Sequence, residues 1–305
     1  MQPKKSFKHL IKGCNGGDFI MKRKSIKISL KIQHLLLYIM LFTIPVLILG
    51  YIIHFYLVED LQNEVMLSND EKLTQVKEFV DSKYVELHNI SSTISTKREF
   101  SPNYLTSYYK VMQAKELLNY KIADEFIHDI FYYSRENGYL FSYNTSYTLP
   151  VLYNNHYKYV DWSPDEFLQD IEQSKSTFVR PAEEVVLANN EHVNMITYGV
   201  PVPFNSSNPY GTLLFLINEE VIDNMLSNVV GSTDGFAYIL NSEGEIIADY
   251  NGLNYDSSSL FQQLQKNEEV FQEMTLDNQQ FYVSHVKSAY QDWYYIAVTP
   301  ESHLM

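Results

Sequence analysis

The spacing of apolar residues changes twice along the chain. Residues 35–57 form one continuous apolar run, and within residues 59–95 an apolar side chain recurs at every third or fourth position from Leu73 to Ile94. From about residue 126, short runs rich in Tyr, Phe, Val and Ile alternate with turn residues. These patterns are typical of a membrane helix, an amphipathic helix and β-strands, in that order. The chain is therefore expected to be α+β, with an anchor, a stalk and sheets.

The first apolar run is long enough to cross a membrane. Residues 35–57 contain no Asp, Glu, Lys or Arg, and at 1.5 Å per residue they span the roughly 30 Å hydrocarbon core. Lys and Arg crowd the preceding tail, so the positive-inside tendency predicts a cytoplasmic N-terminus and an extracellular main domain at the cell membrane. A cleaved signal peptide is the alternative, but its apolar core is typically only about 7–15 residues.

Charge is distributed as unevenly as hydropathy. Residues 1–34 hold nine of the 23 Lys and Arg with Asp18 as the one acid, and the rest has 14 basic against 36 acidic residues, net −22. The acidic residues 35–305 repel the phosphates of nucleic acids, so no nucleic acid partner is expected for this segment.

The chain has a single cysteine, Cys14, in the basic tail, and one cysteine cannot form an intramolecular disulfide. Met21, followed by Lys22, is an alternative start to Met1.

The second pattern predicts a stalk helix over residues 58–100. Its apolar stripe consists of Leu73, Val76, Val80, Tyr84, Leu87, Ile90 and Ile94. Such a stripe packs either on its own domain or also on a second subunit as a short coiled coil. A homodimer through the stalk is one of these two alternatives.

The remaining chain predicts two similar modules. Asn-Gly within residues 135–138, between strand-like runs, indicates a hairpin, and residues 144–158 are expected to be a polar loop. Ser163 and Glu166 form the pattern of a capped helix start. The turn-rich residues 231–235 mark a boundary, after which a second hairpin begins.

Further elements follow from the same signals. Strands are expected at residues 126–133, 139–143, 178–180, 193–204, 211–217, 236–240, 245–250, 270–275, 280–288 and 293–299, with helices at 106–121, 163–174, 219–228 and 258–265. The predicted modules therefore cover residues 101–230 and 231–305.

This order of elements resembles the double Cache (dCache, PAS-like) extracytoplasmic sensor family. The similarity is carried by the segments YGTLLFLI (210–217), GFAYILNSEGE (235–245) and DWYYIAVTP (292–300). The resemblance implies a membrane-distal module at 101–230 and a membrane-proximal module at 231–305. The Tyr-rich first module looks most like the sensor half of membrane-bound AraC-type transcriptional regulators of Gram-positive bacteria.

The output class stays open at this stage. In those regulators a second membrane helix and a helix-turn-helix region follow, and neither pattern is present here, so a fragment, a truncated product or another architecture is expected. Sensor histidine kinases and chemoreceptors carry similar input domains, and fold analogy does not separate them.

No catalytic or metal motif stands out. The nine His are scattered, and there is no Gly-x-Ser-x-Gly, no Walker loop and no His-Glu-x-x-His. We therefore expect no enzyme, no metal and no cofactor.

The resemblance places a ligand pocket between the first sheet and the long loop. The candidates are Tyr132, Tyr143, Tyr147, Trp162, Arg180 and Tyr198. Aromatic rings can enclose a small solute, and Arg180 can hold a carboxylate. The alternative is that Tyr132 and Tyr198 are core residues and Arg180 is a surface residue.

These expectations converge on signal transduction. A small extracellular solute, or a solute-binding protein carrying it, is the expected partner. The alternative from another class of protein is an envelope adhesion protein. An exposed aromatic strip would favour adhesion, and a closed pocket would favour sensing.

Overall fold

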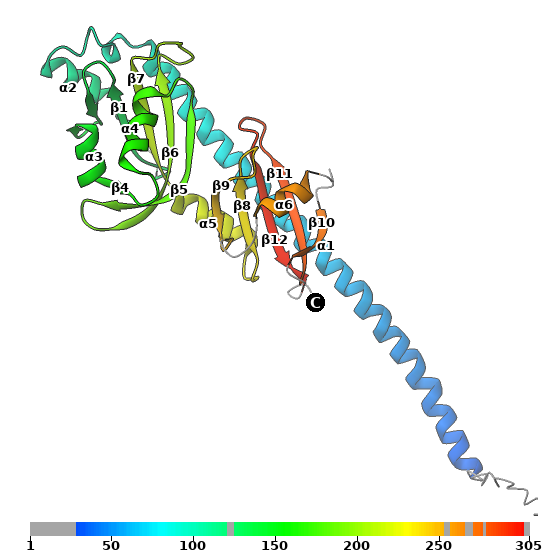
Figure 1. The fold of residues 1–305 in the computed structure, drawn as a ribbon. Coiled ribbons are helices and arrows are strands. Elements are labelled where there is room, and N and C mark those ends of the chain that lie inside the picture. Colours follow the sequence, from blue (N-terminus) through cyan, green and yellow to red (C-terminus); the bar gives the residue numbers. More distant parts are fainter. Residues whose placement is uncertain (1–28, 121–124, 253–256, 266–270, 277–278, 302–305) are drawn as a thin grey trace, which may run out of the picture. The chain divides into compact units, whose positions relative to one another are not determined.

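The computed structural model describes residues 29–120, 125–252, 257–265, 271–276 and 279–301 (Figure 1). Most of the basic tail, with Cys14 and both candidate starts, lies outside these residues. The chain divides into two units, Met1–Tyr56 and Leu57–Met305, which are described separately.

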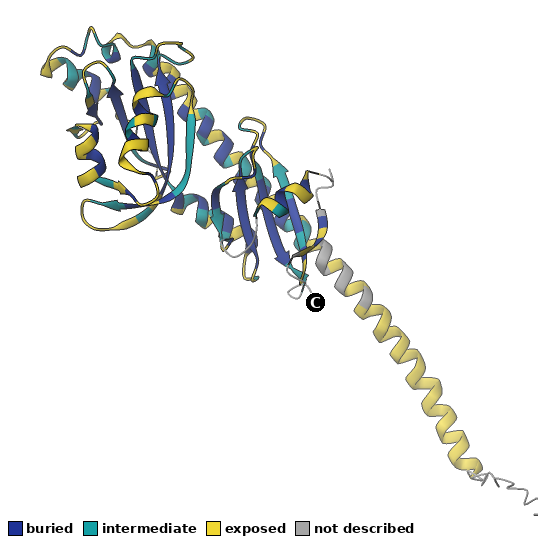
Figure 2. Ribbon diagram, viewed as in Figure 1, coloured by how far each residue is buried: buried dark blue, intermediate teal, exposed yellow. Residues whose placement is uncertain are grey.

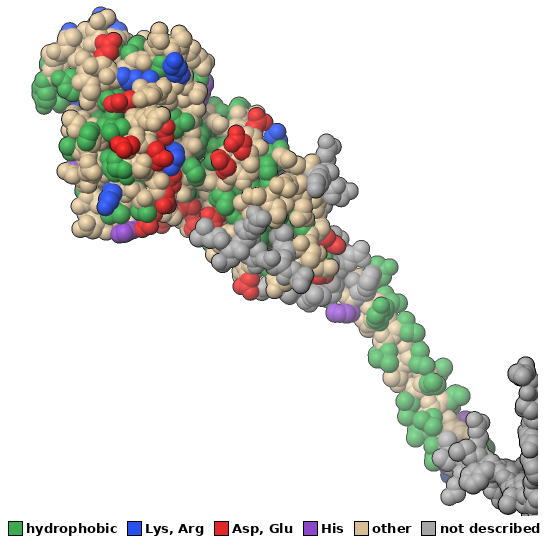
Figure 3. Space-filling model, viewed as in Figure 1, with side chains coloured by type: hydrophobic (Ala, Val, Ile, Leu, Met, Phe, Trp, Pro, Cys, Tyr) green, Lys and Arg blue, Asp and Glu red, His purple; other side chains and the backbone are tan. Residues whose placement is uncertain are grey.

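The first unit contains the start of helix α1 (Leu30–Thr96). Over Leu30–His54 this helix has a mean hydropathy of 2.5, and none of that segment is buried. The helix is exposed along this segment (Figure 2), and hydrophobic side chains lie along it (Figure 3). Its length and composition suffice for a membrane span and suggest an anchor. This candidate span begins at Leu30, five residues before the predicted Leu35.

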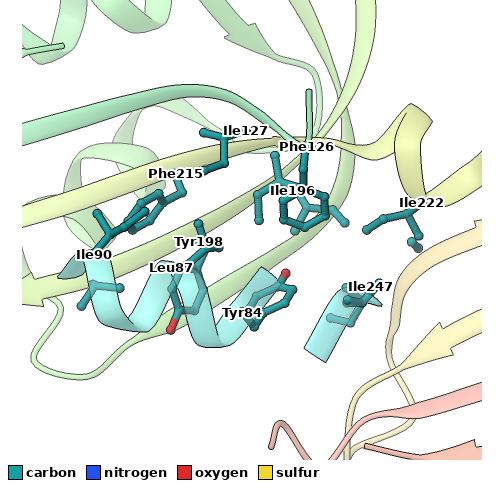
Figure 4. Close-up of a cluster of buried hydrophobic side chains, with 14 of the residues drawn as sticks. Tyr84, Leu87, Ile90, Phe126, Ile127, Ile196, Tyr198, Phe215, Ile222 and Ile247 are labelled. Carbon is teal, nitrogen blue, oxygen red and sulfur yellow. The ribbon is translucent and has the colours of Figure 1, made fainter. Parts of the chain in front are cut away.

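In the second unit, the apolar stripe of α1 is buried by its own domain. All seven predicted stripe residues, from Leu73 to Ile94, are at most 6% exposed. The first of the two alternatives is therefore confirmed, because the stripe packs on both sheets (Figure 4). A homodimer would have to use another face of the molecule.

The first module is a seven-stranded sheet in which all neighbouring strands are antiparallel. The strand order is β3-β2-β1-β7-β6-β5-β4. The strands are β1 (Ile127–Ser134), β2 (Tyr139–Phe141), β3 (Ser146–Tyr147), β4 (Tyr157–Tyr159), β5 (Phe178–Leu187), β6 (His192–Val202) and β7 (Gly211–Asn218).

Four helical elements belong to this module. They are η1 (Arg98–Phe100), α2 (Tyr108–Glu116), α3 (Leu149–Asn155) and α4 (Pro164–Gln173). The predicted cap of α4 is confirmed, since Ser163 and Glu166 form a reciprocal capping box. The predicted hairpin is confirmed as well: β1 and β2 pair Ser134 with Tyr139, and Gly138 takes a φ of 64°, which glycine adopts readily.

The prediction of a polar loop at residues 144–158 is wrong. This segment contains β3, α3 and the start of β4. Pro150 stands in the first turn of α3, where its missing N–H costs nothing, and Leu149, Leu152 and Tyr153 are buried. Their burial stabilises a helix too short to show a clear period in the sequence. The strand expected at 178–180 likewise continues to Leu187, and the helix expected at 106–121 is shorter.

The second module is a five-stranded antiparallel sheet of order β10-β11-β12-β8-β9. Its elements are β8 (Phe236–Leu240), β9 (Ile246–Tyr250), α6 (Ser257–Leu264), β10 (Phe271–Leu276), β11 (Gln279–Lys287) and β12 (Tyr294–Pro300). Helix α5 (Glu219–Val230) connects the modules. Side chains from α1, α5 and both sheets form one continuous core. The predicted fold class, two antiparallel-sheet modules behind a long helix, is confirmed.

Candidate functional site

The first sheet is covered on both faces, and its side chains alternate between them. On β1, Ile130 and Tyr132 join the core against α1. Phe131 and Tyr133 point to the other face, where α3 and α4 pack. A solute pocket between the sheet and α3 or α4 can therefore use only the second set.

A cleft of about 280 Å³ opens on this α3 face, at the end of the sheet where β1 begins. Its walls come from four separate segments of the chain. They are His128, Asp129 and Phe131; Asn144, Thr145 and Tyr147; His156 and Tyr157; and Leu187, Ala188 and Asn189. We call this the β1–β4 cleft.

One carboxylate is fixed in the cleft by two donors. Oδ1 of Asp129 accepts the backbone N–H of Ile130 at 2.9 Å, and Oδ2 accepts the hydroxyl of Tyr157 at 3.3 Å. Burial and the charge of Asp129 raise the pKa of Tyr157 above its ordinary value, so the phenol stays protonated and keeps donating. The Asp129 carboxylate is the negative group of the cleft, suited to a cationic or N–H-bearing ligand.

Aromatic rings form much of the remaining lining. The rings of Tyr147 and His156 lie 4.1 Å apart between centroids and are inclined by 32°. His128 meets Tyr157 edge-on at 5.9 Å. Such a wall supplies apolar area with polar edges, which is typical of small-ligand sites.

On the same face of the sheet as the cleft lies a packed cluster around Trp162. The guanidinium of Arg180 lies 4.8 Å from the centroid of the Trp162 ring and donates to Oε1 of Glu183 at 2.5 Å. Trp162 is fully buried, and the indole N–H donates to Asp170 at 3.2 Å. Burial raises the pKa of Glu183, and Arg180 partly offsets that effect.

This ion pair keeps unused hydrogen-bonding capacity. Nε of Arg180 and Oε2 of Glu183 are buried and have no hydrogen-bond partner among the described residues. One of these atoms belongs to the cation and the other to the anion. Each of the two charged side chains can therefore make one more hydrogen bond.

The six predicted site residues are not brought together. Tyr147 lines the β1–β4 cleft, while Trp162 and Arg180 belong to a separate cluster. Tyr143 is 41% exposed. Their part in binding stays a prediction.

Tyr132 and Tyr198 lie on the wrong face for a pocket with Trp162. Both are buried against α1, and the Tyr132 hydroxyl donates to the carbonyl of Phe100 at 2.6 Å. Gly211 leaves the space that the Tyr132 ring fills, because a Cβ there would collide with that ring. Both are core residues in this structure, and their part in binding stays a prediction. Arg180, which the alternative to a ligand-binding role expected at the surface, is instead partly buried in its ion pair.

Sequence reasoning missed Asp129, His156, Tyr157 and Glu183. For Asp129 a signal existed, since a carboxylate in the middle of the strand FIHDIFYY is unusual. The others belong to segments whose fold was not recognised or whose partners are distant in sequence.

Comparison with known proteins gives structural likeness at low sequence identity. No family model matches the chain, and no curated protein matches its sequence. The ligand-binding domain of Mlp24 with asparagine superposes with a TM-score of 0.52 at 18% identity, covering 81% of this chain and 96% of that one.

Two further solved domains are similar to a comparable degree. The sensory domain of the Campylobacter jejuni chemoreceptor Tlp3 with isoleucine gives a TM-score of 0.51 at 14% identity, over 81% and 97% of the two chains. The ligand-binding domain of the Pseudomonas aeruginosa amino acid chemoreceptor PctB with L-Gln gives 0.50 at 14%, over 78% and 91%. The chain shares the Cache-type fold of these sensor domains.

Proposed function

We propose that this chain is the membrane-anchored, extracytoplasmic sensory part of a bacterial signalling protein and that the β1–β4 cleft binds its ligand. The cleft is the observation that carries the proposal. It lies on the sheet face that α3 and α4 cover, and it combines a fixed carboxylate with aromatic walls. The apolar helix over Leu30–His54, preceded by the basic tail, supports an anchor with the sheets outside the cell.

An amino acid is the ligand class best supported. The similar domains were solved with asparagine, isoleucine and glutamine. The Asp129 carboxylate can accept the ammonium group of such a ligand, and Tyr147 and His156 can border its side chain. Arg180 is the one cation among the six predicted site residues and is suited to bind the carboxylate of such a ligand. In this structure, however, it is paired with Glu183.

A chemoreceptor is better supported as the output class than an AraC-type regulator, and a sensor histidine kinase stays an alternative that rests on the sequence resemblance alone. The solved domains named in the comparison include chemoreceptors, whereas the AraC link rests on the sequence resemblance alone.

Ligand binding would shift the populations of two conformations of the sensor. Only a ligand with different affinities for the two conformations can do so.

A thermal-shift screen tests the proposal. The full chain in lipid nanodiscs is heated with each of the twenty amino acids, and a ligand at 100 times its Kd adds about 2.7 kcal/mol to the free energy of unfolding. One or a few amino acids should raise the melting temperature reproducibly. No shift with any amino acid, and none with sugars, carboxylates or short peptides, would contradict solute sensing.

A second candidate function is contact with an envelope polymer or protein. Tyr108, Tyr109 and Tyr139 are 81%, 71% and 52% exposed, and Tyr108 and Tyr139 border a hollow of about 180 Å³ together with Phe141. Exposed aromatic groups of this kind favour an interaction surface. A pull-down with isolated cell wall, compared with the Tyr108→Ser/Tyr109→Ser variant, tests this candidate: equal retention of both proteins would exclude the surface.

A further inference from the structure

A second carboxylate stands at the rim of the β1–β4 cleft. Asn189 lines the cleft, and its side-chain amide donates to Oε2 of Glu191 at 3.0 Å. The amide oxygen of Asn189 in turn accepts the backbone N–H of Glu191, also at 3.0 Å. These two bonds hold Glu191 beside one wall of the cleft, while the residue itself is exposed to solvent.

The strand pairing places the Glu191 side chain on the cleft side of the sheet. Val186 of β5 pairs with His192 of β6. The ladder continues one residue further, where the backbone N–H of Leu187 donates to the carbonyl of Glu191 at 2.8 Å. Leu187 also pairs with Tyr157 of β4. Side chains of directly opposite residues on neighbouring strands lie on the same face. Because Leu187 and Tyr157 line the cleft, Glu191 projects from the cleft face.

Carboxylates outnumber Lys and Arg in and around the cleft. Asp129 lines its interior, and none of the described lining residues is Lys or Arg. Glu191 lies two strand spacings, roughly 10 Å, from Tyr157, whose hydroxyl donates to Asp129. The cleft therefore presents one negative group inside and a second one at its rim, and a ligand chain of several bonds can reach from one to the other.

This distribution of charge separates the classes of amino acid. A neutral amino acid brings one ammonium group and so supplies a cation for only one of the two carboxylates. An acidic amino acid adds a further negative charge to the cleft, which the two carboxylates disfavour. An amino acid with a cationic side chain brings two cations at opposite ends of a flexible chain, one for each carboxylate.

The aromatic lining suits the side chain of such a ligand. The rings of Tyr147 and His156 lie 4.1 Å apart between centroids, and both border the cleft. Methylene groups of a long cationic side chain can pack on rings of this kind, and a guanidinium or ammonium group is attracted to the face of a tyrosine.

We propose that the ligand of the β1–β4 cleft is an amino acid with a cationic side chain, such as arginine or lysine, and that Glu191 determines this specificity. The proposal rests on the proposed function of the cleft. The α-ammonium group binds Asp129, and the side-chain cation binds Glu191. The amide of Asn144, which lines the cleft, is a neutral donor for the carboxylate of the ligand.

Arginine and citrulline test the specificity, because citrulline has the same length but carries a neutral urea group in place of the guanidinium. Both are titrated calorimetrically into the full chain in lipid nanodiscs at about 0.05 M salt, where exposed charges are little screened. We expect arginine to bind at least about fivefold more tightly than citrulline, the upper range for an exposed ion pair.

Variants of the two carboxylates should respond differently. Glu191→Gln keeps the shape and an acceptor oxygen, so it should weaken arginine to within about twofold of citrulline and leave citrulline unchanged. Asp129→Asn should weaken both ligands alike, because both carry the α-ammonium group. Glu243→Gln, an exposed glutamate in the turn between β8 and β9, is the matched control and should bind both ligands as the native chain does.

Two results would overturn the proposal. One is an equal Kd for arginine and citrulline in the native chain, and the other is a Glu191→Gln variant that keeps the native preference for arginine. A neutral amino acid that binds in an Asp129-dependent way without this preference removes the specificity and leaves the cleft as the sensory site. If no amino acid binds at all, the proposed function fails as well.

Discussion

The Tyr157 hydroxyl donates to Oδ2 of Asp129 at 3.3 Å, although their strands are not neighbours. In the sheet order, β7, β6 and β5 separate β1 from β4. A direct hydrogen bond across three strands requires the sheet to curl at this end, as the twist of antiparallel strands allows. The curled end is where the β1–β4 cleft opens, so the bond that closes the sheet also positions the carboxylate of the candidate site.

The ion pair beside Trp162 should matter for stability. Arg180→Ala leaves Glu183, whose side chain is 8% exposed, without its cation and should lower the free energy of unfolding by about 2 kcal/mol. Adding Glu183→Gln removes the stranded charge and should recover roughly half of that loss. Urea unfolding of both variants, followed by tryptophan fluorescence, measures the two effects. An Arg180→Ala variant as stable as the native chain would show that the pair is not coupled.

The polar tie between α1 and the second module should also be measurable. Ser288→Ala removes the donor to Asp81, a carboxylate that is 4% exposed, and should cost about 1–2 kcal/mol. Ser82→Ala, on the exposed side of the same helix, is the control and should change the unfolding free energy by less than about 0.5 kcal/mol. Equal costs for the two variants would argue against the tie.

Glu219 should make stability depend on pH. It is 7% exposed, and burial, followed by the charges of Asp223 and Asp249, raises its pKa to about 7. Because the folded pKa lies above the unfolded value of 4.5, the folded state is favoured while the group is protonated. That advantage is lost as the pH rises from 4.5 through 7.

Glu219→Gln removes this penalty and keeps a hydrogen-bonding side chain. Relative to the native chain, the variant should gain on the order of 2–3 kcal/mol of stability between pH 5 and pH 8. Urea midpoints at both pH values give the difference. A difference that does not grow with pH would mean that Glu219 titrates normally.

The sequence predicts most of the architecture because its signals there are local. The capping box at Ser163 and Glu166 and the Asn-Gly hairpin act within a few residues. The stripe on α1 is equally readable, since one side of the helix faces solvent. Helix α3 escapes prediction because its seven residues are stabilised by the burial of Leu149 and Leu152, which is a tertiary effect.

The site is harder to predict, and the reason is the sheet itself. Both faces of β1 and β6 are buried, so large aromatic residues occur at successive positions. Phe131 and Tyr132 face opposite sides of the sheet, but the sequence does not distinguish the two faces. Without polar alternation, the face of a tyrosine cannot be deduced. The contact between Asp129 and Tyr157 depends on the curl of the whole sheet, which no short pattern encodes.

Calorimetric titration of amino acids into the full chain, compared with its Asp129→Asn variant, tests the central claim most directly. Asn keeps the shape and an acceptor oxygen but removes the charge, so an amino acid that binds the native chain should bind this variant at least tenfold more weakly. Asp165→Asn, an exposed carboxylate on α4, should leave the Kd unchanged. Undiminished affinity in Asp129→Asn, or no amino acid binding to the native chain, would contradict the assignment of the β1–β4 cleft as the sensory site.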